Sequence, residues 1–203
     1  MADASRGVTA VHDPEEVVDV LFEAFHDYPV MRFVLGPGRA DYGRDLRTLI
    51  GFFVMSRALR SEHLLGVRGA GGGLEAAAIV SRPGAPAPPA LSALREAVWS
   101  GLGDGARRRY EAFTAACTPF LPEGPHLHLN MIGVRQAVKG RGRGRMLLDH
   151  VHALSRDDSE SDGVSLSTEN PANVRIYEHV GYVVTGHAVV SPDLETWALY
   201  RPD

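Results

Sequence analysis

Apolar residues recur along the N-terminal part of the chain at the spacing of helices. From residue 14 to residue 28 they return every three or four positions, after Asp13 as a helix cap and Pro14 in the first helical position. Pro29 ends the predicted helix, because proline has no amide proton to continue it. The same spacing returns between Tyr42 and Leu59 and predicts a second helix there.

Shorter runs predict strands. Apolar and polar residues alternate in residues 6–11, and residues 63–84 contain two strand-like runs around a series of glycines, which predicts a β-hairpin. A proline-rich connector at 83–90 follows the hairpin. Helical spacing then returns at 91–100 and at 104–116.

The C-terminal part alternates strands with helices. The predicted order is a strand at 126–134, a helix to about Ser155, a strand at 163–168, a helix capped by Asn170 and Pro171 and ended by Gly181, and strands at 182–190 and 196–200. Strand–helix–strand units of this length have parallel strands, whereas the last two strands predict an antiparallel pair. The sequence therefore predicts a mixed α/β fold.

Composition restricts the class of protein. The 203 residues, 44% of them hydrophobic, predict one soluble domain spanning 1–203. A net charge of -4 argues against a nucleic-acid partner, because such domains are usually basic. The longest apolar runs are too short to cross a bilayer, so no membrane partner is expected. Cys117 is the only cysteine, which favours a reducing compartment and predicts a cytoplasmic location.

One short stretch concentrates positive charge. Glycine and arginine alternate from Lys139 to Arg145, between a predicted strand and a predicted helix. The free amides at a helix N-terminus bind anions, and glycines let the backbone approach one closely. The spacing does not match a Walker A loop and matches a dinucleotide fingerprint poorly. On this spacing alone, a pyrophosphate site and a basic surface turn both remain open.

The surrounding residues resemble a known family. The stretch IGVRQAVKGRGRGRMLLDHV (132–151) resembles the acetyl-CoA-binding motif of the GCN5-related N-acetyltransferases (GNAT), although Lys139 replaces the usual Gln or Arg and Gln136 stands where proline is common. The later stretch LSTENPANVRIYEHVGY (166–182) resembles a second motif of the family, with Asn173 and Tyr177 in matching places. The resemblance covers residues 126–183.

This resemblance implies a fold and a cofactor. The implied fold is a central mixed, mostly antiparallel sheet of about six to seven strands, flanked by helices, with a parallel pair splayed apart at the acetyl-CoA site. The cofactor would be acetyl-CoA, and no metal is expected. The residues implied to hold it are Ile132, Gly133, Val134, Lys139, Gly140, Arg141, Gly142, Arg143, Gly144, Arg145, Asn173 and Tyr177.

Two residues are the candidates for proton transfer. Period-2 alternation places His126, His128 and Asn130 on one face of a strand, and the register of the glycine motif puts the family's frequent base at His128. The resemblance makes Tyr177 the general acid that protonates the departing thiolate. A half-buried strand histidine and a core tyrosine are the structural alternatives. Glu169 is interpreted as a solvated loop residue.

The sequence thus predicts an acetyl-CoA-dependent N-acetyltransferase that transfers the acetyl group directly to a small-molecule amine in a ternary complex. The alternatives are a protein or peptide N-acetyltransferase and a non-catalytic module that binds CoA or nucleic acid. The acceptor pocket is expected between the two N-terminal helices and the loops around 30–37 and 83–90. Tyr28, Phe33 and Trp99 are its candidate lining residues. The oligomeric state is left open, with a homodimer as one option.

Overall fold

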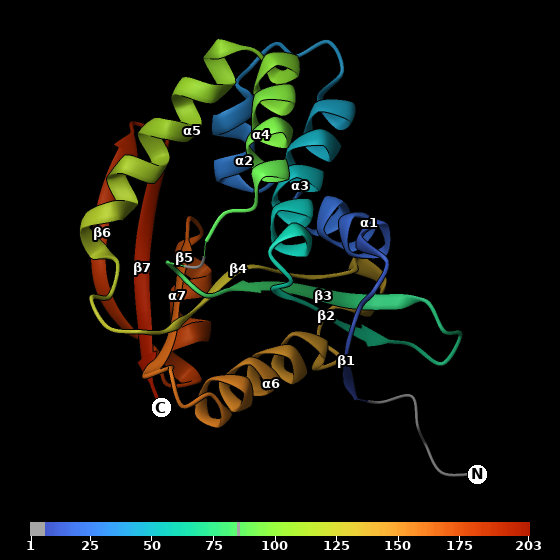
Figure 1. Cartoon of the computed structure of the whole chain (residues 1–203), viewed down its shortest axis with the longest axis vertical. Helices are drawn as coiled ribbons and strands as arrows, with labels where there is room; N and C mark the ends of the chain where they lie inside the picture. Colours follow the sequence, from blue (N-terminus) through green and yellow to red (C-terminus); the bar gives the residue numbers. More distant parts are fainter. Residues whose placement is uncertain (1–6, 85) are drawn as a thin grey trace.

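The computed structural model describes residues 7–84 and 86–203 and arranges them around one twisted sheet (Figure 1). Its strands are β1 (Val8–Ala10), β2 (His63–Arg68), β3 (Leu74–Ser81), β4 (Leu127–Val134), β5 (Gly163–Thr168), β6 (Val183–Ser191) and β7 (Leu194–Pro202). The α-helices are α1 (Pro14–Phe25), α2 (Pro29–Leu35), α3 (Tyr42–Leu59), α4 (Pro89–Leu102), α5 (Asp104–Cys117), α6 (Arg143–Asp157) and α7 (Pro171–His179). Two short 3-10 turns, Thr118–Phe120 and Gln136–Val138, complete the order.

The sheet has the predicted mixed topology. Its strands lie in the order β1-β2-β3-β4-β5-β7-β6 among the described residues, and every neighbouring pair is antiparallel except β4 with β5. This parallel pair is short, because only Leu127–Leu129 of β4 pair with Val164–Leu166 of β5. Beyond these residues the two strands separate. The predicted fold class, with its splayed parallel pair, is confirmed.

Helices cover both faces of the sheet and create two apolar cores. The side chains of Ala77 and Ile79 in β3 belong to the core beneath α1 to α5, whereas those of Ala76, Ala78 and Val80 belong to the core beneath α6 and α7. This alternation is the period-2 pattern of a strand that is buried on both sides. Figure 1 shows α6 on one side of the central strands and α1 to α5 on the other.

A β-bulge interrupts β4 at Asn130. Leu129 pairs with Val80 and Met131 pairs with Ile79, so Asn130 has no partner in β3. The extra residue reverses the alternation: Leu129 belongs to the core beneath α6, and Met131 to the core beneath α1. The strict period predicted for His126, His128 and Asn130 therefore ends at Asn130.

Pro29 begins a helix, and the predicted loop around 30–37 is wrong over most of its length. α1 ends at Phe25, and α2 then starts with Pro29 in its first turn. Proline is favoured at that position because the first helical amides have no partner within the helix. The same rule correctly placed the starts of α1 at Pro14 and of α7 at Pro171.

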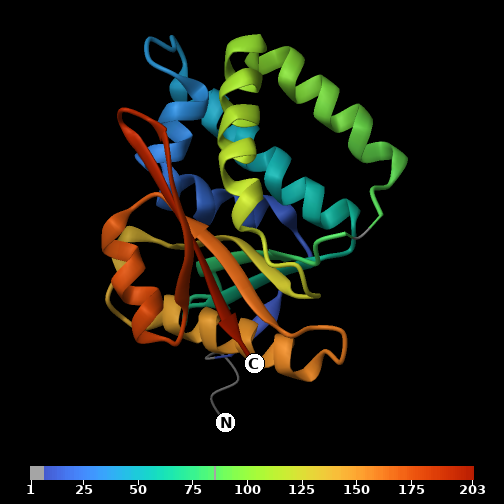
Figure 2. The same cartoon turned by 90° about the vertical axis from the view of Figure 1, so that its left-hand side faces the viewer.

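The long connection between β3 and β4 folds into α4 and α5. These helices pack on α2 and α3, and α5 also packs against β6. Figure 2 shows α5 descending beside the β6–β7 hairpin, on the same side of the sheet as α1 to α3. The first strand is shorter than predicted, and residue 6 of that prediction lies outside the described residues. None of the described helices is long and apolar enough to cross a membrane.

Candidate active site

A groove of about 630 Å³ runs along the splayed end of β4. Ile132 to Val134 form one wall, the glycine–arginine turn and the start of α6 form its end, and α7 contributes Asn173 and Tyr177. The segment from Glu23 to Pro29 closes the remaining side. The groove therefore lies where the strands separate and a helix begins, which is the usual place for an anion site in such folds.

The turn presents free backbone amides to this groove. Among the described residues, no backbone hydrogen bond uses the amides of Gly140, Gly142, Arg143, Gly144 or Arg145. Gly140 and Gly142 have φ values of 76° and 77°, which L side chains rarely adopt. A Cβ built on either glycine would meet nothing within 4 Å, so the space beside them is open. These features fit a diphosphate held by peptide N–H groups.

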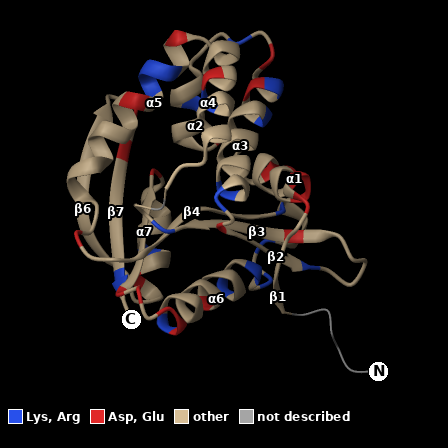
Figure 3. Cartoon of the chain, in the orientation of Figure 1, with Lys and Arg blue, Asp and Glu red and all other residues tan. Residues whose placement is uncertain are grey.

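The arginines of the turn do not all face the groove. Nε of Arg143 lies 2.6 Å from Oε2 of Glu75, and Nε of Arg145 lies 2.7 Å from Oδ1 of Asp149. The exposed Arg141 is not part of the groove lining, whereas Lys139 is. Figure 3 shows these positive charges gathered at the N-terminal end of α6. The backbone thus supplies most of the anion-binding groups here, and side chains supply a more distant positive field.

The structure brings together all but one of the residues predicted to hold the cofactor. Arg141 is the exception. Those that line the groove are Ile132, Gly133, Val134, Lys139, Gly140, Gly142, Arg143, Gly144, Arg145, Asn173 and Tyr177. Their contacts with a cofactor stay a prediction.

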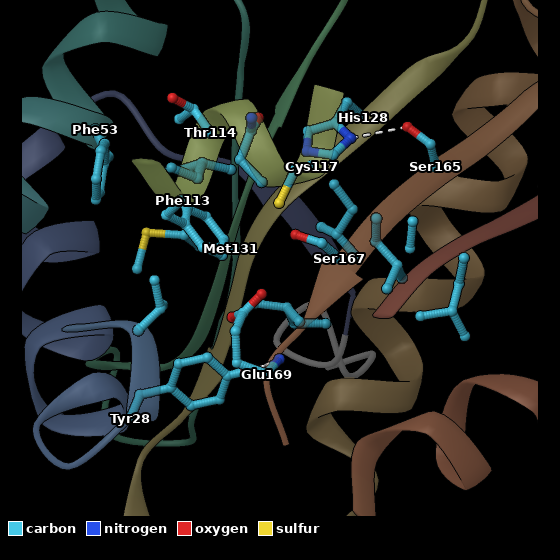
Figure 4. A pocket seen from close by; sticks show the side chains of 18 of the residues that line it. Tyr28, Phe53, Phe113, Thr114, Cys117, His128, Met131, Ser165, Ser167 and Glu169 are labelled. Carbon is cyan, nitrogen blue, oxygen red and sulfur yellow. Dashed lines mark hydrogen bonds between the residues drawn. The ribbon is translucent and has the colours of Figure 1, made fainter. Parts of the chain in front are cut away.

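A second cavity, of about 360 Å³, lies on the other side of the splay. It is bounded by the α1–α2 junction, α3, α5 and the residues at the β4–β5 contact (Figure 4). Most of its wall is apolar, and seven Phe and Tyr side chains contribute: Phe25, Tyr28, Phe53, Tyr110, Phe113, Phe120 and Tyr177. Three ionisable polar side chains also line it, namely Arg57, His128 and Glu169.

The groove and the cavity meet at Tyr177. This residue lines both, together with Phe25, Tyr28, Ile132 and Asn173. Its side chain is 9% exposed, and burial raises the pKa of its hydroxyl above the ordinary value. Tyr177 is therefore protonated at neutral pH and can act as a proton donor at the point where the two spaces join.

Hydrogen bonds fix the junction from several elements. The Tyr28 hydroxyl lies 2.8 Å from Oγ1 of Thr168, which also accepts from Nδ2 of Asn173 at 3.2 Å. The amide of Glu169 donates to the same Tyr28 hydroxyl at 3.2 Å. The α1–α2 junction, the end of β5 and the start of α7 are held together in this way.

His128 lines the cavity, as its predicted role requires, but its environment is not that of a group titrating near neutrality. Its Nδ1 lies 2.8 Å from Oγ of Ser165 (Figure 4). Burial lowers the pKa of His128 to about 4, with smaller effects from His126 and Arg57. The imidazole is therefore neutral at pH 7 and holds a proton weakly. His126 is buried, with Nδ1 donating to the carbonyl of Gly124 at 2.7 Å, and is not part of the cavity lining.

Glu169 is not the solvated loop residue that the sequence suggested. It is the first residue after β5 and is 7% exposed. Its Oε1 accepts a hydrogen bond from Oγ1 of Thr196 at 2.9 Å, and its carboxylate points into the cavity (Figure 4). Burial raises the pKa of Glu169 to about 7, which hydrogen bonds from Thr196 and Tyr28 only partly offset. Its place directly after a parallel strand was the available signal, since ligands bind at that end of a sheet.

The acceptor-side predictions are only partly correct. Tyr28 lines the cavity, but Phe33 and Trp99 do not: both pack in the core beneath the helices. The wall formed by α5 was missed. Tyr110, Phe113 and Cys117 occupy one face of that helix at i, i+3 and i+7, a spacing that is visible in the sequence. Burial raises the pKa of the Cys117 thiol to about 11, so the thiol is not activated as a nucleophile.

Within the described ranges, no three His, Cys, Asp or Glu side chains are placed to hold a metal ion.

Comparison with known proteins agrees with this geometry. Residues 106–182, which include the turn and Tyr177, match the family model described as the acetyltransferase (GNAT) family. This similarity to the GNAT family is confined to a segment that makes up less than half of the chain. No curated protein matches the chain at a significant level.

Solved structures of acetyltransferases share the fold of this chain. A structure from Corynebacterium glutamicum, named as histone acetyltransferase HPA2 and related acetyltransferase, is 23% identical with a TM-score of 0.69, covering 98% of this chain and 97% of the other. Arylalkylamine N-acetyltransferase 2 from Aedes aegypti is 12% identical (TM-score 0.63; 95% and 96% covered). A ribosomal-protein-alanine N-acetyltransferase from Escherichia coli is 13% identical (TM-score 0.56; 97% and 93% covered).

Proposed function

We propose that this GNAT enzyme transfers the acetyl group of acetyl-CoA directly to the amine of a small molecule, with both substrates bound at once. The observation that carries the proposal is the meeting of two spaces at Tyr177. The groove with its free amides suits the cofactor, and the aromatic cavity suits an acceptor. A direct transfer needs the two reacting groups side by side, which this junction provides.

The groove residues fit acetyl-CoA. The amides of the turn would bind its diphosphate, and the unpaired edge of β4 from Ile132 to Val134 would bind the pantetheine arm as an added strand. Asn173 lies farther along, near the junction. Acetyl-CoA supplies an acetyl thioester whose carbonyl an amine can attack. A backbone N–H of β4 near Ile132 to Val134 would stabilise the negative charge on that carbonyl oxygen.

The protein must also move protons. An alkylamine is mostly protonated at pH 7, and generating its neutral form costs roughly 4–5 kcal/mol, so a proton acceptor is needed. The thiolate that departs needs a proton, and the Tyr177 hydroxyl is placed to give it. His128 was the acceptor predicted from the sequence, and its place in the cavity keeps it a candidate for contact with the acceptor amine.

The shape of the cavity favours a small molecule over a peptide chain. α5 and the α1–α2 junction both line the cavity, where a peptide would need an open groove. The similar structures are named for both kinds of acceptor, an arylalkylamine in one case and a ribosomal protein in another. A protein N-terminus is therefore the second candidate acceptor. The single domain, the homodimer option and the cytoplasmic location stay predictions.

Incubation with acetyl-CoA and a panel of amines tests the proposal through the release of free thiol. We expect thiol release with small alkylamines and little with peptides that carry a free N-terminus. Calorimetric titration with CoA is the companion measurement. Binding of CoA without thiol release for any amine would indicate a non-catalytic CoA-binding module, and absence of CoA binding would overturn the proposal.

A further inference from the structure

The acceptor cavity carries an unusual combination of charge and apolar surface. Seven Phe and Tyr side chains line it, and its permanent cation, Arg57, is already paired, with Nε 3.3 Å from Oε2 of Glu62. Glu169 is the carboxylate in the lining, and no Lys, Arg or His of the described residues pairs with it. A buried carboxylate without a counterion is rare, because removing its water is costly unless a cation takes that place.

The position of Glu169 shows where such a cation would lie. One carboxylate oxygen accepts from Thr196 at 2.9 Å, and the group points into the cavity between the labelled side chains of Tyr28 and Ser167 (Figure 4). Glu169 and Tyr177 line the same cavity, and the charge of Glu169 contributes to the raised pKa of Tyr177. A cation bound to Glu169 would therefore lie close to the junction where acetyl transfer takes place.

We propose that the cavity binds a monoamine with an apolar, ring-sized tail and no acidic group, and that Glu169 holds its ammonium group and then takes its proton. The aromatic wall surrounds the tail. An acidic group on the acceptor is disfavoured, because Arg57 is neutralised by Glu62 and Glu169 would repel it. This inference rests on the acetyltransferase function proposed above and names the substrate class and the base for that site.

Acetyl transfer moves two protons from the amine nitrogen and one from Tyr177. One ammonium proton passes to a carboxylate oxygen of Glu169, and the nitrogen lone pair forms the C–N bond while the C–S bond breaks. As the amide forms, Tyr177 donates its proton to the departing sulfur. The second nitrogen proton then passes to Tyr177 and restores its hydroxyl. Glu169 returns its proton to water, so the net products are the amide, free CoA thiol and one proton.

The neighbours of Glu169 keep their charge state in the pH range in which Glu169 titrates. The permanent cation Arg57 of α3 shares the cavity lining and is paired with Glu62. The other ionisable groups of that lining include Tyr28 next to α2, Cys117 on α5, Tyr177 on α7 and His128 on β4. Burial raises the pKa of Tyr28 to about 12 and of Cys117 to about 11, and lowers that of His128 to about 4. All four groups are uncharged between pH 6 and 8, where Glu169 changes its charge.

The substrate class is tested with three probes that share a primary amine. We expect kcat/KM for 2-phenylethylamine to exceed that for ethylamine by at least about 100-fold, because the ring buries apolar area in the cavity. Phenylalanine, which adds a carboxylate to the same skeleton, should react at least about 100-fold more slowly than 2-phenylethylamine. Equal rates with all three probes would overturn the substrate class.

The role of Glu169 is tested with Glu169→Gln, which keeps the shape and can still accept from Thr196. For the wild type, kcat/KM with 2-phenylethylamine should rise with pH and level off near the Glu169 pKa of about 7. In Glu169→Gln only the neutral amine reacts, so kcat/KM should be lower by about 10²–10⁴ at pH 7 and keep rising tenfold per pH unit toward the pKa of the amine. A plateau near pH 7 that persists in Glu169→Gln would overturn the proposal.

A binding measurement separates this role from a structural one. Calorimetry of 2-phenylethylamine with the enzyme–CoA complex, in buffers of different ionisation enthalpy, should show release of about half a proton from wild type at pH 7, because about half of Glu169 is protonated before the ammonium binds. Glu169→Gln binds the neutral amine and should release about one proton from the ammonium in solution. The exposed Glu178 supplies the control Glu178→Gln, which should behave as wild type. CoA affinity and thermal melting report whether each variant is folded.

The two proposals fail in different ways. If no amine gives thiol release, the acetyltransferase function fails. If thiol release occurs while the pH profile and proton release of Glu169→Gln equal those of wild type, only the assignment of Glu169 fails.

Discussion

Tyr177 is positioned by packing rather than by hydrogen bonds. Its ring contacts that of Tyr182 at a centroid distance of 5.6 Å and belongs to the core beneath α6 and α7. Among the described residues, no hydrogen bond involves its hydroxyl, which opens onto the junction of groove and cavity. A hydroxyl without a protein partner is available to a departing thiolate, so the packing serves the chemistry directly.

This arrangement predicts the effect of Tyr177→Phe. The variant keeps the ring and loses the proton donor, so kcat should fall by about 10²–10⁴ while the affinity for CoA stays unchanged. Tyr182→Phe is the matched control, because that hydroxyl is also buried but lies 3.1 Å from Nε2 of His152, away from both spaces. Steady-state kinetics and calorimetry provide the measurements. Equal losses of turnover and affinity in Tyr177→Phe would show that its hydroxyl is structural.

At the scale of elements, the bulge in β4 and the turn before α6 work together. The bulge at Asn130 interrupts pairing with β3 just where β4 leaves β5, and the turn then places free amides at the end of the groove. Gly133 contributes in another way: a Cβ there would lie 2.7 Å from Cβ of Ala24, so glycine lets α1 approach the sheet. Strand, turn and helix thus form one continuous binding edge.

The turn predicts a specific effect of Gly142→Val. A branched side chain would occupy the open space proposed for the diphosphate and would also strain a backbone at φ 77°. CoA affinity should fall by at least about tenfold.

The control is Gly72→Val, which imposes the same strain at φ 80° in the β2–β3 turn, outside the groove lining. Titration of both variants with CoA separates strain from obstruction. Undiminished binding by Gly142→Val would contradict the assignment of the turn.

At the scale of the whole molecule, the sheet separates two tasks. The side beneath α6 and α7 contributes Tyr177 and the turn proposed for the cofactor, and the side beneath α1 to α5 encloses the cavity proposed for the acceptor. Burial raises the pKa of Glu169 in the cavity to about 7, and lowers to about 4 the pKa of His128 in the same cavity and of His152 on α6. Each makes the stability of the fold depend on pH.

The sign of this dependence follows from linkage. Folding raises the pKa of Glu169 from 4.5 to about 7. The contribution of this group to the free energy of unfolding is therefore fully present below pH 4.5 and is lost as pH rises toward 7. The two histidines act in the opposite sense, since their folded pKa values lie below 6.5 and stability is lost as pH falls toward 4.

Comparison of the stability of Glu169→Gln with that of wild type at the same pH isolates the contribution of Glu169. We expect Glu169→Gln to be more stable than wild type at pH 8, by up to about 3 kcal/mol, and to lose this advantage at pH 4.5. Thermal or denaturant unfolding at the two pH values is the measurement. A pH-independent difference between the two proteins would mean that Glu169 is solvated in the folded state.

The sequence by itself determined the elements that local rules control. Caps and prolines marked the starts of α1 and α7, period-2 runs marked the strands, and alternating glycines marked the anion turn, because each depends on a few neighbouring residues. The two family motifs correctly indicated the match to the GNAT family model over residues 106–182 and the fold with a splayed parallel pair. Pro29 was misread although the same local rule applied to it.

Only the tertiary structure decided the chemistry of the acceptor side. Burial of Glu169 and the low pKa of His128 depend on what α5, β7 and the α1–α2 junction place around them, far away in the sequence. The bulge at Asn130 is set by pairing with β3, and the cavity exists because residues between β3 and β4 fold back as α4 and α5. Desolvation is a property of packed neighbours, and no pattern along one strand or loop contains it.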